Sequence, residues 1–423
     1  MKHSELGLHK AVKTIVLLQI VSCIYNLQQI NYASYMKVNR ILADTILERS
    51  KQYPVIAIVG PRQSGKTTLA QSSFPQKKYI SLEDFDNREF AIDDPRGFLS
   101  GIKDGAILDE VQRVPQLLSY LQTEVDKNPE PGRFILTGSN QFLLMKGLSQ
   151  SLAGRISINR LLPFSLEELD NTIYKPESID HFLYRGGYPR IYDQNLDSRD
   201  WYSNYLNTYF EKDLKDFIQV SDLSSFRKLL VLLASSCGQL LNLSSIGNSI
   251  GVSHNTVKSW IAALEASFLV FLLQPYHNNY QKRVIKSPKI YFYDTGLAST
   301  LLRLKEHSQL TDHYIRGALF ENWAIIEYVK SQLNRGLESD CYFWRDHTGN
   351  EVDLLIETAN GPHPVEFKSG KTIKRDFFKG LEHFSKVAGT SHSTLVYGGD
   401  QNQERSGTTI IPWTDWPGNP VGY

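Results

Sequence analysis

The sequence predicts an α/β protein that begins with a parallel sheet, continues with a helical middle region and ends with a second α/β domain. Helical and strand patterns alternate from Val38 to Leu169, which is typical of a parallel sheet covered by helices. The segment GPRQSGKTT at 60–68 lies between an apolar strand and a helix. Two apolar strands flank Asn360-Gly361, a residue pair that favours a hairpin turn.

At 423 residues the chain is long enough for two or three domains, each with its own core. We expect a P-loop domain at 36–169, a helical linker with a winged-helix-like domain at 170–285, and a second α/β domain at 286–423. Hydrophobic and charged contents of 41% and 22% are those of an ordinary soluble protein. Because the net charge is only +1, any DNA contact would come from a local patch.

Residues 1–35 are expected to be a mis-assigned start or a dispensable extension. Val12–Ile24 is an apolar run that is too short to span a bilayer but could pass for a signal-peptide core. Against export, the segment at 60–68 predicts a site for ATP, which is available in the cytoplasm. Met36 begins a segment that leads directly into the first strand. The three cysteines have neither paired nor metal-ligand spacing, which fits a reducing cytosol. We therefore expect a cytoplasmic protein with no membrane partner.

The segment at 60–68 fits the pattern G-x-x-x-x-G-K-[ST] without a mismatch. Its glycines let backbone N–H groups point at phosphate, and the following helix adds its positive N-terminal end. Lys66 would neutralise the β- and γ-phosphates, and the Thr67 hydroxyl would hold Mg²⁺, so ATP and Mg²⁺ are the expected cofactors. The expected nucleotide contacts in this loop are Gly60, Pro61, Arg62, Gln63, Ser64, Gly65, Lys66, Thr67 and Thr68.

AILDE at 106–110 reads as a buried strand that ends in two acids. Asp109 would coordinate Mg²⁺ directly or through water, and Glu110 would polarise the attacking water. A third strand, Phe134–Thr137, is followed by polar residues that could contact the γ-phosphate or that water. Ser139 or Asn140 is expected in this sensor role, with a simple strand-end turn as the alternative.

Arg155, in the segment LAGR, follows the sensor strand. An arginine there could reach the γ-phosphate of its own nucleotide or of a neighbouring subunit's nucleotide, the second case implying a homo-oligomer. The alternative is an ordinary salt-bridge residue.

The middle region shows a helix–turn–helix pattern. Leu243–Ile250 reads as a short helix, Gly251 as the turn and Ser253 as the cap of a second helix that ends at Ala266. This second helix has one lysine and no arginine, so a spacer or dimerisation module is as good a reading as a DNA-recognition helix. The polar residues expected to face outward are His254, Asn255, Lys258 and Ser259, and the expected wing strands are Leu269–Leu273 and Ile290–Phe292.

NEVDLLIE at 350–357 and HPVEFKSG at 363–370 read as the paired strands of a hairpin. A turn centred on Asn360-Gly361 would place Asp353 directly opposite Lys368, with Glu366 on the same face.

Two carboxylates with a lysine beside them form the D…E-x-K arrangement of metal-dependent nucleases, and their oxygen atoms suit Mg²⁺ or Mn²⁺. The metal would be held by Asp353 and Glu366, with Glu321 on the preceding helix as a further ligand, and would generate hydroxide. Lys368 would orient the water or the scissile phosphate. The alternative is an exposed hairpin with solvated charges.

Beyond these motifs, the chain resembles the AAA+-type P-loop ATPases of bacteria and archaea that end in a domain of unknown function with a restriction-endonuclease-like fold. The resemblance covers nearly everything after Met36. It implies an AAA+-like sheet and a C-terminal PD-(D/E)-x-K nuclease domain with Asp353, Glu366 and Lys368 as active-site residues, while Glu321 matches more loosely. The blocks that carry it are GPRQSGKTTLA, AILDE, FILTGSN, LAGR, FLYRGGYPRIY, KIYFYDTGLA, GALFENW, FWRDHTGNEVDLLI and VEFKSGK.

Together these patterns predict a Mg²⁺-dependent ATPase coupled, through the winged-helix-like middle, to a nuclease-fold module that acts on DNA. One alternative is an ATP-dependent regulatory or signalling switch whose nuclease-like domain does not cleave and binds protein or DNA instead. The other is a DNA-binding regulator whose ATPase sets its oligomeric state.

Overall fold

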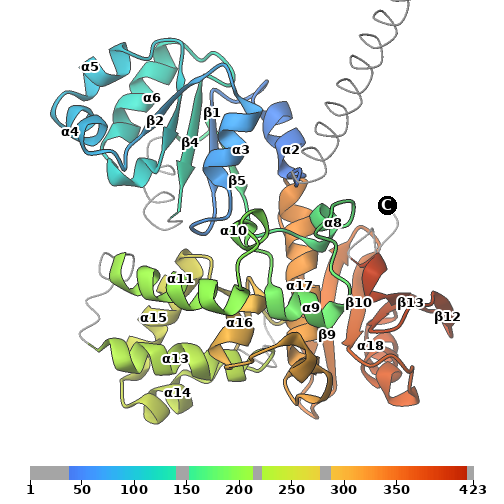
Figure 1. Ribbon diagram of the computed structural model, residues 1–423. Helices are drawn as coiled ribbons and strands as arrows, with labels where there is room; N and C mark the ends of the chain where they lie inside the picture. Colours follow the sequence, from blue (N-terminus) through green and yellow to red (C-terminus); the bar gives the residue numbers. More distant parts are fainter. Residues whose placement is uncertain (1–37, 140–151, 213–221, 277–286, 417–423) are drawn as a thin grey trace, which may run out of the picture.

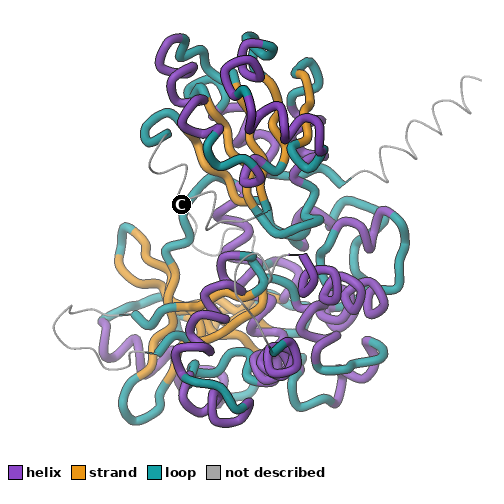
Figure 2. Tube along the Cα trace, turned by 90° about the vertical axis from the view of Figure 1, so that its left-hand side faces the viewer, coloured by secondary structure: helices purple, strands orange, loops and turns teal. Residues whose placement is uncertain are grey.

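The computed structural model describes residues 38–139, 152–212, 222–276 and 287–416 (Figure 1). The expected N-terminal extension and Asn140 lie outside these residues. Figure 2 shows two separate groups of strands, one within the upper domain and one in the lower part of the molecule. No helix in the described ranges is long and apolar enough to cross a membrane.

The first sheet is parallel throughout and has the strand order β2-β3-β4-β1-β5. Because all its strands run in one direction, the carboxyl ends of β1, β3 and β4 meet at one edge. Its strands are β1 (Val55–Val59), β2 (Lys78–Ser81), β3 (Ala106–Asp109), β4 (Phe134–Gly138) and β5 (Ile156–Arg160). The parallel-sheet domain predicted from the alternating pattern is therefore confirmed.

Every residue of β1 is fully buried, because helices cover both faces of the sheet. Ile56 and Ile58 pack on α2 and α3, whereas Val55, Ala57 and Val59 face the opposite cluster with α6. The helices of this domain are α2 (Leu42–Arg49), α3 (Lys66–Ser73), α4 (Phe85–Asp93), α5 (Pro95–Ser100) and α6 (Leu117–Lys127), with a 3₁₀ turn at Val111–Arg113.

The middle region is largely helical and ends in a two-stranded antiparallel pair, β6 and β7. Gly251 takes a positive φ of 79° between α14 and α15, and the Ser253 hydroxyl caps α15 by accepting from the Thr256 N–H at 3.1 Å. The elements are α8 (Leu166–Leu169), α9 (Ile179–Arg185), α10 (Pro189–Asp193), α11 (Ser198–Lys212), α13 (Leu223–Ser235), α14 (Leu243–Ile250), α15 (His254–Ala266), β6 (Val270–Leu273) and β7 (Lys289–Phe292).

The second sheet is mixed and has the order β12-β13-β11-β10-β9-β8. The long helix α17 packs on one face, and α18 covers the other through Leu381 and Phe384. The elements are α16 (Thr295–Leu301), α17 (Arg316–Asn334), β8 (Cys341–Arg345), β9 (Glu351–Thr358), β10 (Gly361–Lys368), α18 (Lys379–Ala388), β11 (Ser393–Tyr397), β12 (Gln403–Arg405) and β13 (Thr408–Pro412), with 3₁₀ turns at His307–Asp312, Arg375–Phe378 and Trp413–Asp415.

The predicted register of the β9–β10 hairpin is wrong by two residues. Gly361 pairs with Thr358 and Val365 pairs with Leu354, whereas a turn centred on Asn360-Gly361 would have paired Val365 with Ile356. The turn falls at Ala359-Asn360, one residue earlier than expected. Gly361, with a positive φ of 104°, is already the first residue of β10, and the Thr358 hydroxyl donates to its carbonyl at 2.7 Å. A shift of two residues preserves the face of the paired residues. Asp353 lies beyond the last pair of this ladder, where β9 bulges between Val352 and Leu355, so its predicted position opposite Lys368 is not kept.

Helix α17 joins the two halves of the molecule. Figure 1 shows it running from the lower part of the molecule up to α2 of the P-loop domain. At its carboxyl end, the Asn334 carbonyl accepts from the Thr45 hydroxyl at 2.9 Å, and the Gly336 carbonyl accepts from Arg49. The helix is accordingly buried along most of its length.

We predict that Gly105→Ala destabilises the P-loop domain far more than Gly154→Ala. Both glycines have a positive φ (86° and 76°), which costs an alanine about 1–2 kcal/mol. A Cβ on Gly105 would in addition lie 1.8 Å from the Arg133 carbonyl oxygen, whereas nothing lies within 4 Å at Gly154. The clash should cost about 1–3 kcal/mol more. Thermal unfolding of both variants checks this, and equal losses would contradict it.

Candidate functional site

The P-loop lies between β1 and α3, where the sequence requires close backbone approach. A Cβ on Gly60 would lie 2.0 Å from the Leu161 carbonyl oxygen, so only glycine lets β1 end this close to β5. Gly65 caps α3 with a left-handed φ of 92°. The Lys66 side chain is buried and its ammonium donates to the Pro61 carbonyl at 2.8 Å, so the loop already curls around its lysine.

Asp109, at the end of β3, accepts hydrogen bonds from three hydroxyl groups. The Thr67 hydroxyl donates to Oδ1 at 2.8 Å, the Thr137 hydroxyl donates to the same oxygen, and the Tyr79 hydroxyl donates to Oδ2 at 2.9 Å. Burial and then the negative charge of Asp109 raise the pKa of Tyr79 to about 12, so this tyrosine stays protonated as a donor. A hydroxyl and a carboxylate in contact supply two hard oxygen ligands, which fits Mg²⁺.

Glu110 follows Asp109 and is held by two polar side chains. The Ser139 hydroxyl donates to Glu110 Oε2 at 2.9 Å, and the Gln112 amide donates to the same oxygen. Burial would raise the pKa of Glu110, but the positive charge of Lys66 and these hydrogen bonds outweigh burial and lower it. Glu110 is therefore ionised, as a group that polarises water must be. Ser139 contacts this carboxylate, an arrangement that the sequence did not suggest.

A cavity of about 1090 Å³ opens beside the P-loop. Of the loop contacts expected from the sequence, Gln63, Gly65, Lys66, Thr67 and Thr68 line it together with Glu110, whereas Gly60, Pro61, Arg62 and Ser64 do not. Arg62 instead lies 3.8 Å from Glu83.

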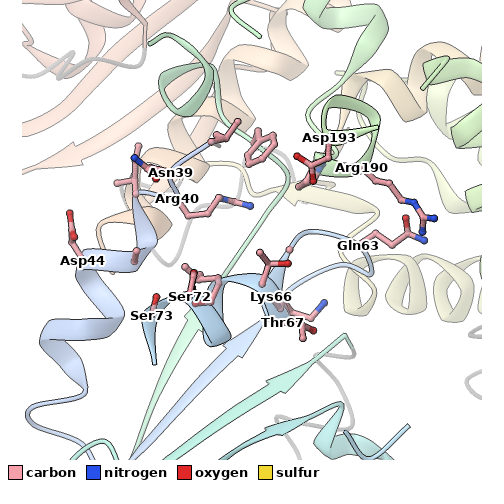
Figure 3. A pocket seen from close by; sticks show the side chains of 18 of the residues that line it. Asn39, Arg40, Asp44, Gln63, Lys66, Thr67, Ser72, Ser73, Arg190 and Asp193 are labelled. Carbon is pink, nitrogen blue, oxygen red and sulfur yellow. Dashed lines mark hydrogen bonds between the residues drawn. The ribbon is translucent and has the colours of Figure 1, made fainter. Parts of the chain in front are cut away.

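The outer wall of this cavity, which we define as Phe164, Pro189 and Arg190, comes from outside the sheet. Figure 3 shows Lys66 and Thr67 at the start of α3, with Arg40 on one side and Arg190 and Asp193 across from it. The sequence analysis assigned no role to Arg40 or to the outer wall. The GGYPR segment was a signal, because its glycines permit close packing: a Cβ on Gly187 would lie 2.4 Å from the Phe164 carbonyl oxygen.

Arg155 does not line the nucleotide cavity. Val55 pairs with Ile156 and Val59 with Arg160, so Arg155 precedes β5 at the edge of the sheet opposite the P-loop. Its guanidinium is paired with Asp126, and its carbonyl accepts from the Val55 N–H at 3.2 Å. Contact with the chain's own nucleotide is therefore excluded by the strand direction. Contact with a neighbouring subunit's nucleotide stays a prediction.

Asp353 and Glu366 form a second polar centre on the other sheet, and each is only 7% exposed. Asp353 Oδ2 accepts from the Phe367 N–H at 2.9 Å, and Glu366 Oε1 accepts from the Lys368 ammonium at 2.5 Å. Glu366 Oε2 is buried and has no hydrogen-bond partner among the described residues. Burial and the charge of Asp353, offset in part by Lys368, raise the pKa of Glu366 to about 8.

Glu321, on α17, is held by a lysine that the sequence analysis missed. The Lys289 ammonium donates to Glu321 at 3.0 Å and also contacts Glu351, and the Tyr291 hydroxyl donates to Glu321 at 2.6 Å. Burial would lower the pKa of Lys289, but the surrounding carboxylates raise it. Within the described ranges, no group of three His, Cys, Asp or Glu side chains is arranged to hold a metal ion. A charged residue that opens the apolar strand KIYF was the available signal.

The sheet, the P-loop and the acid-ended strand define an AAA-type P-loop ATPase domain, and residues 52–170 match the AAA domain family. Residues 176–308 and 316–416 match two families described as domains of unknown function, DUF8612 and DUF4143.

Uncharacterized proteins of Mycobacterium tuberculosis (strain ATCC 25618 / H37Rv) and Mycobacterium bovis are each 30% identical to this chain over 385 residues. The match covers 89% of this chain and 84% of each relative, so the chain belongs to the same family as these mycobacterial proteins. An uncharacterized protein of Methanocaldococcus jannaschii is 24% identical over 335 residues, which are 72% of each chain.

Two solved structures are similar at a lower level. The Walker-type ATPase PABY2304 of Pyrococcus abyssi has a TM-score of 0.43 and 15% identity, covering 62% of this chain and 94% of that one. AMPPCP-bound DnaA from Aquifex aeolicus has a TM-score of 0.29 and 19% identity, covering 53% and 86%. Similarity at this level carries no inference about what this chain binds.

We predict that Glu110→Gln retains ATP binding and loses turnover by about 10²–10⁴-fold, because the amide no longer polarises water while Lys66 and Thr67 are unchanged. Nucleotide affinity and phosphate release measure the two effects separately. Glu124→Gln, which alters an exposed ion pair with Lys127 in the same domain, is the control and should behave as wild type. Equal turnover in wild type and Glu110→Gln would refute the assignment.

Proposed function

We propose that this protein is a Mg²⁺-dependent ATPase coupled to a nuclease-fold module that acts on DNA. In the first site, Lys66 neutralises the phosphates, Thr67 and Asp109 hold Mg²⁺, and Glu110 polarises the attacking water. Bound Mg²⁺ would offset the charge that develops on the β- and γ-phosphates. Ser139 and Gln112 keep the Glu110 carboxylate in place, and the match to the AAA domain family supports this half of the proposal.

The observation that carries the second half is the partnerless oxygen of Glu366. A buried anionic oxygen is costly unless a proton or a cation neutralises it. Glu366 Oε2 lacks a partner among the described residues, and the charge of Asp353 acts on Glu366. We therefore propose that Asp353 and Glu366 hold Mg²⁺ or Mn²⁺, which would supply a metal-bound hydroxide. Lys368, whose side chain is 31% exposed, would orient the phosphodiester.

DNA is the proposed target because of two exposed polar surfaces. A basic segment follows β10 directly, and its cations contact phosphate without reading sequence. In the middle region, His254, Asn255 and Lys258 are exposed on α15, as a winged-helix recognition helix requires. The exposed cations of the basic segment are Lys371, Lys374, Arg375 and Lys379, interrupted by one acid, Asp376.

A regulatory switch is the second candidate. Glu321, expected as a third metal ligand, is already neutralised by Lys289 and bonded to Tyr291. Two acids are fewer ligands than a tightly held cation commonly receives, although water completes the shell of Mg²⁺ in many sites. This pairing favours a nuclease-like domain that binds DNA or protein without cleaving it.

We predict that the wild-type protein cleaves DNA in the presence of Mn²⁺ and that Asp353→Ala abolishes both metal binding and cleavage. Lys368→Ala should keep the metal and lose cleavage by about 10²-fold or more, because only phosphate orientation is removed. Asp376→Asn, an exposed acid in the neighbouring basic segment, is the control. Retained Mn²⁺ binding without cleavage of any DNA or RNA would support the regulatory switch instead.

We also predict a pH signature for Glu366 in metal-free protein. Its pKa is raised from 4.5 to about 8, so as pH rises the unfolded chain releases this proton before the folded chain does. The free energy of unfolding therefore falls as the pH rises from 4.5 to about 8, and this contribution is fully present below pH 4.5.

Glu366→Gln should raise the thermal unfolding midpoint by several degrees at about pH 8.5 and leave it unchanged near pH 4, in the presence of a chelator. Mn²⁺ should stabilise wild type at the higher pH and not the variant. Identical unfolding profiles for the two proteins across this range would refute the buried-carboxylate assignment.

A further inference from the structure

The outer wall of the nucleotide cavity is held by the C-terminal half of the chain. Phe164 lies in the segment between β5 and α8, and Pro189 and Arg190 begin α10. Neither segment belongs to the sheet that carries the P-loop, so their position depends on what packs behind them.

A buried ion pair on α17 fixes the first segment. The Lys330 ammonium donates to the Phe164 carbonyl at 2.9 Å, and Glu327 Oε2 accepts from the Leu166 N–H at 2.7 Å. Lys330 and Glu327 also contact each other at 2.9 Å, with side chains only 4% and 0% exposed. Both side chains are therefore removed from water. Besides contacting each other, each makes a hydrogen bond to the backbone behind the outer wall.

Asp294, which follows β7, fixes the second segment. Its Oδ2 accepts from the Gly187 N–H at 2.7 Å, two residues before Pro189. The two segments are also joined to each other, because the Phe164 N–H donates to the Gly187 carbonyl at 2.7 Å. The outer wall is thus one unit tied to α17 and to the end of β7.

Arg40 links this unit to the P-loop itself. Its guanidinium donates to the Ser64 carbonyl at 2.8 Å, to the Leu162 carbonyl at 2.6 Å and to Glu168 at 2.9 Å. A movement of the P-loop on binding phosphate would therefore act on the segment that Glu327 and Lys330 hold.

The same two elements carry Lys289 and Glu321, which lie near the second polar centre on β9 and β10. Glu321 is six residues before Glu327 on α17, about 9 Å along the axis, and it binds Lys289 and Tyr291 of β7. The Asn322 side chain accepts from the Phe292 N–H at 2.7 Å and donates to the Phe292 carbonyl at 2.8 Å, which fastens α17 to β7.

We propose that Glu327 and Lys330 are positioning residues of the ATP site and that α17 and β7 link nucleotide binding to the Asp353–Glu366 centre. The link follows the polar contacts behind the outer wall, the length of α17 and the Lys289–Glu351 ion pair, which reaches β9 two residues before Asp353. By thermodynamic reciprocity each site then changes the affinity of the other. Its functional meaning, though not its existence, rests on the proposed role of that centre.

The first test compares Lys330→Met and the double variant Glu327→Gln/Lys330→Met with wild type. The double variant removes both charges and so avoids leaving an unpaired buried ion, which protects the fold. The Kd and KM for ATP should rise about tenfold, the change that about 1.4 kcal/mol gives. kcat should stay within about twofold, because Lys66, Asp109 and Glu110 are untouched.

Arg335→Met is the matched control. Arg335 caps α17 and pairs with Glu167 of α8 at 2.8 Å through an exposed ion pair. It therefore joins α17 to α8, as the bond from Leu166 to Glu327 does. It should leave the Kd unchanged. A folded double variant that binds ATP as tightly as wild type would overturn the positioning role. A wild type that binds no ATP would instead defeat the nucleotide assignment itself.

Hydrogen exchange tests the link between the sites. A non-hydrolysable ATP analogue with Mg²⁺ should slow amide exchange in α17 and β7 of wild type by several fold. In the double variant saturated with the analogue, the P-loop should stay protected while α17 and β7 lose that added protection. Unchanged exchange in α17 and β7 of wild type would overturn the link, whatever the Kd values show.

Discussion

The parallel direction of β1, β3 and β4 is the constraint on which the first site depends. The register of these strands brings Val59 beside Gly138 and Leu108 beside Leu136, so their next residues emerge together at one edge. Three different strand ends therefore supply Lys66, the Asp109–Glu110 pair and Ser139, without any loop having to reach across the sheet. An antiparallel strand would have placed its last residue at the opposite edge of the sheet. Arg155 lies at that opposite edge because it precedes the parallel strand β5.

The two centres shift the pKa of a buried glutamate in opposite directions. Glu110 has a lowered pKa because Lys66 and two donors outweigh its burial, whereas Glu366 has a raised pKa because burial and Asp353 outweigh Lys368. The Glu110 carboxylate is therefore ionised without any added ligand. The Glu366 carboxylate is held at a free-energy cost that a proton or a cation relieves. In the proposed function, the first site is therefore already assembled and the second still requires a ligand.

Strand ends and helix caps could be predicted from the sequence because they depend on local pattern. The buried strand before the P-loop, the acid-ended strand and the Gly251 turn with its Ser253 cap all follow from neighbouring residues. The hairpin register could not, because the turn falls at Ala359-Asn360, where the Thr358 hydroxyl bonds the Gly361 carbonyl, instead of at Asn360-Gly361. Lys289 also escaped notice, since its partners Glu321 and Glu351 lie 32 and 62 positions further along the chain.

The contact from Lys330 to the Phe164 carbonyl has a consequence for how the chain matures on the ribosome. The P-loop and its sheet are complete once residue 160 has emerged, but the backbone behind the outer wall gains its partner only when α17 is made. At usual elongation rates of about 5–20 residues per second, this interval lasts roughly 10–30 s. During that time a nascent P-loop domain has its P-loop but lacks the Lys330 contact that holds the outer wall of its cavity. By the proposed positioning role, tight nucleotide binding would require synthesis through α17, and ATP binding would report that this helix has been made and has packed.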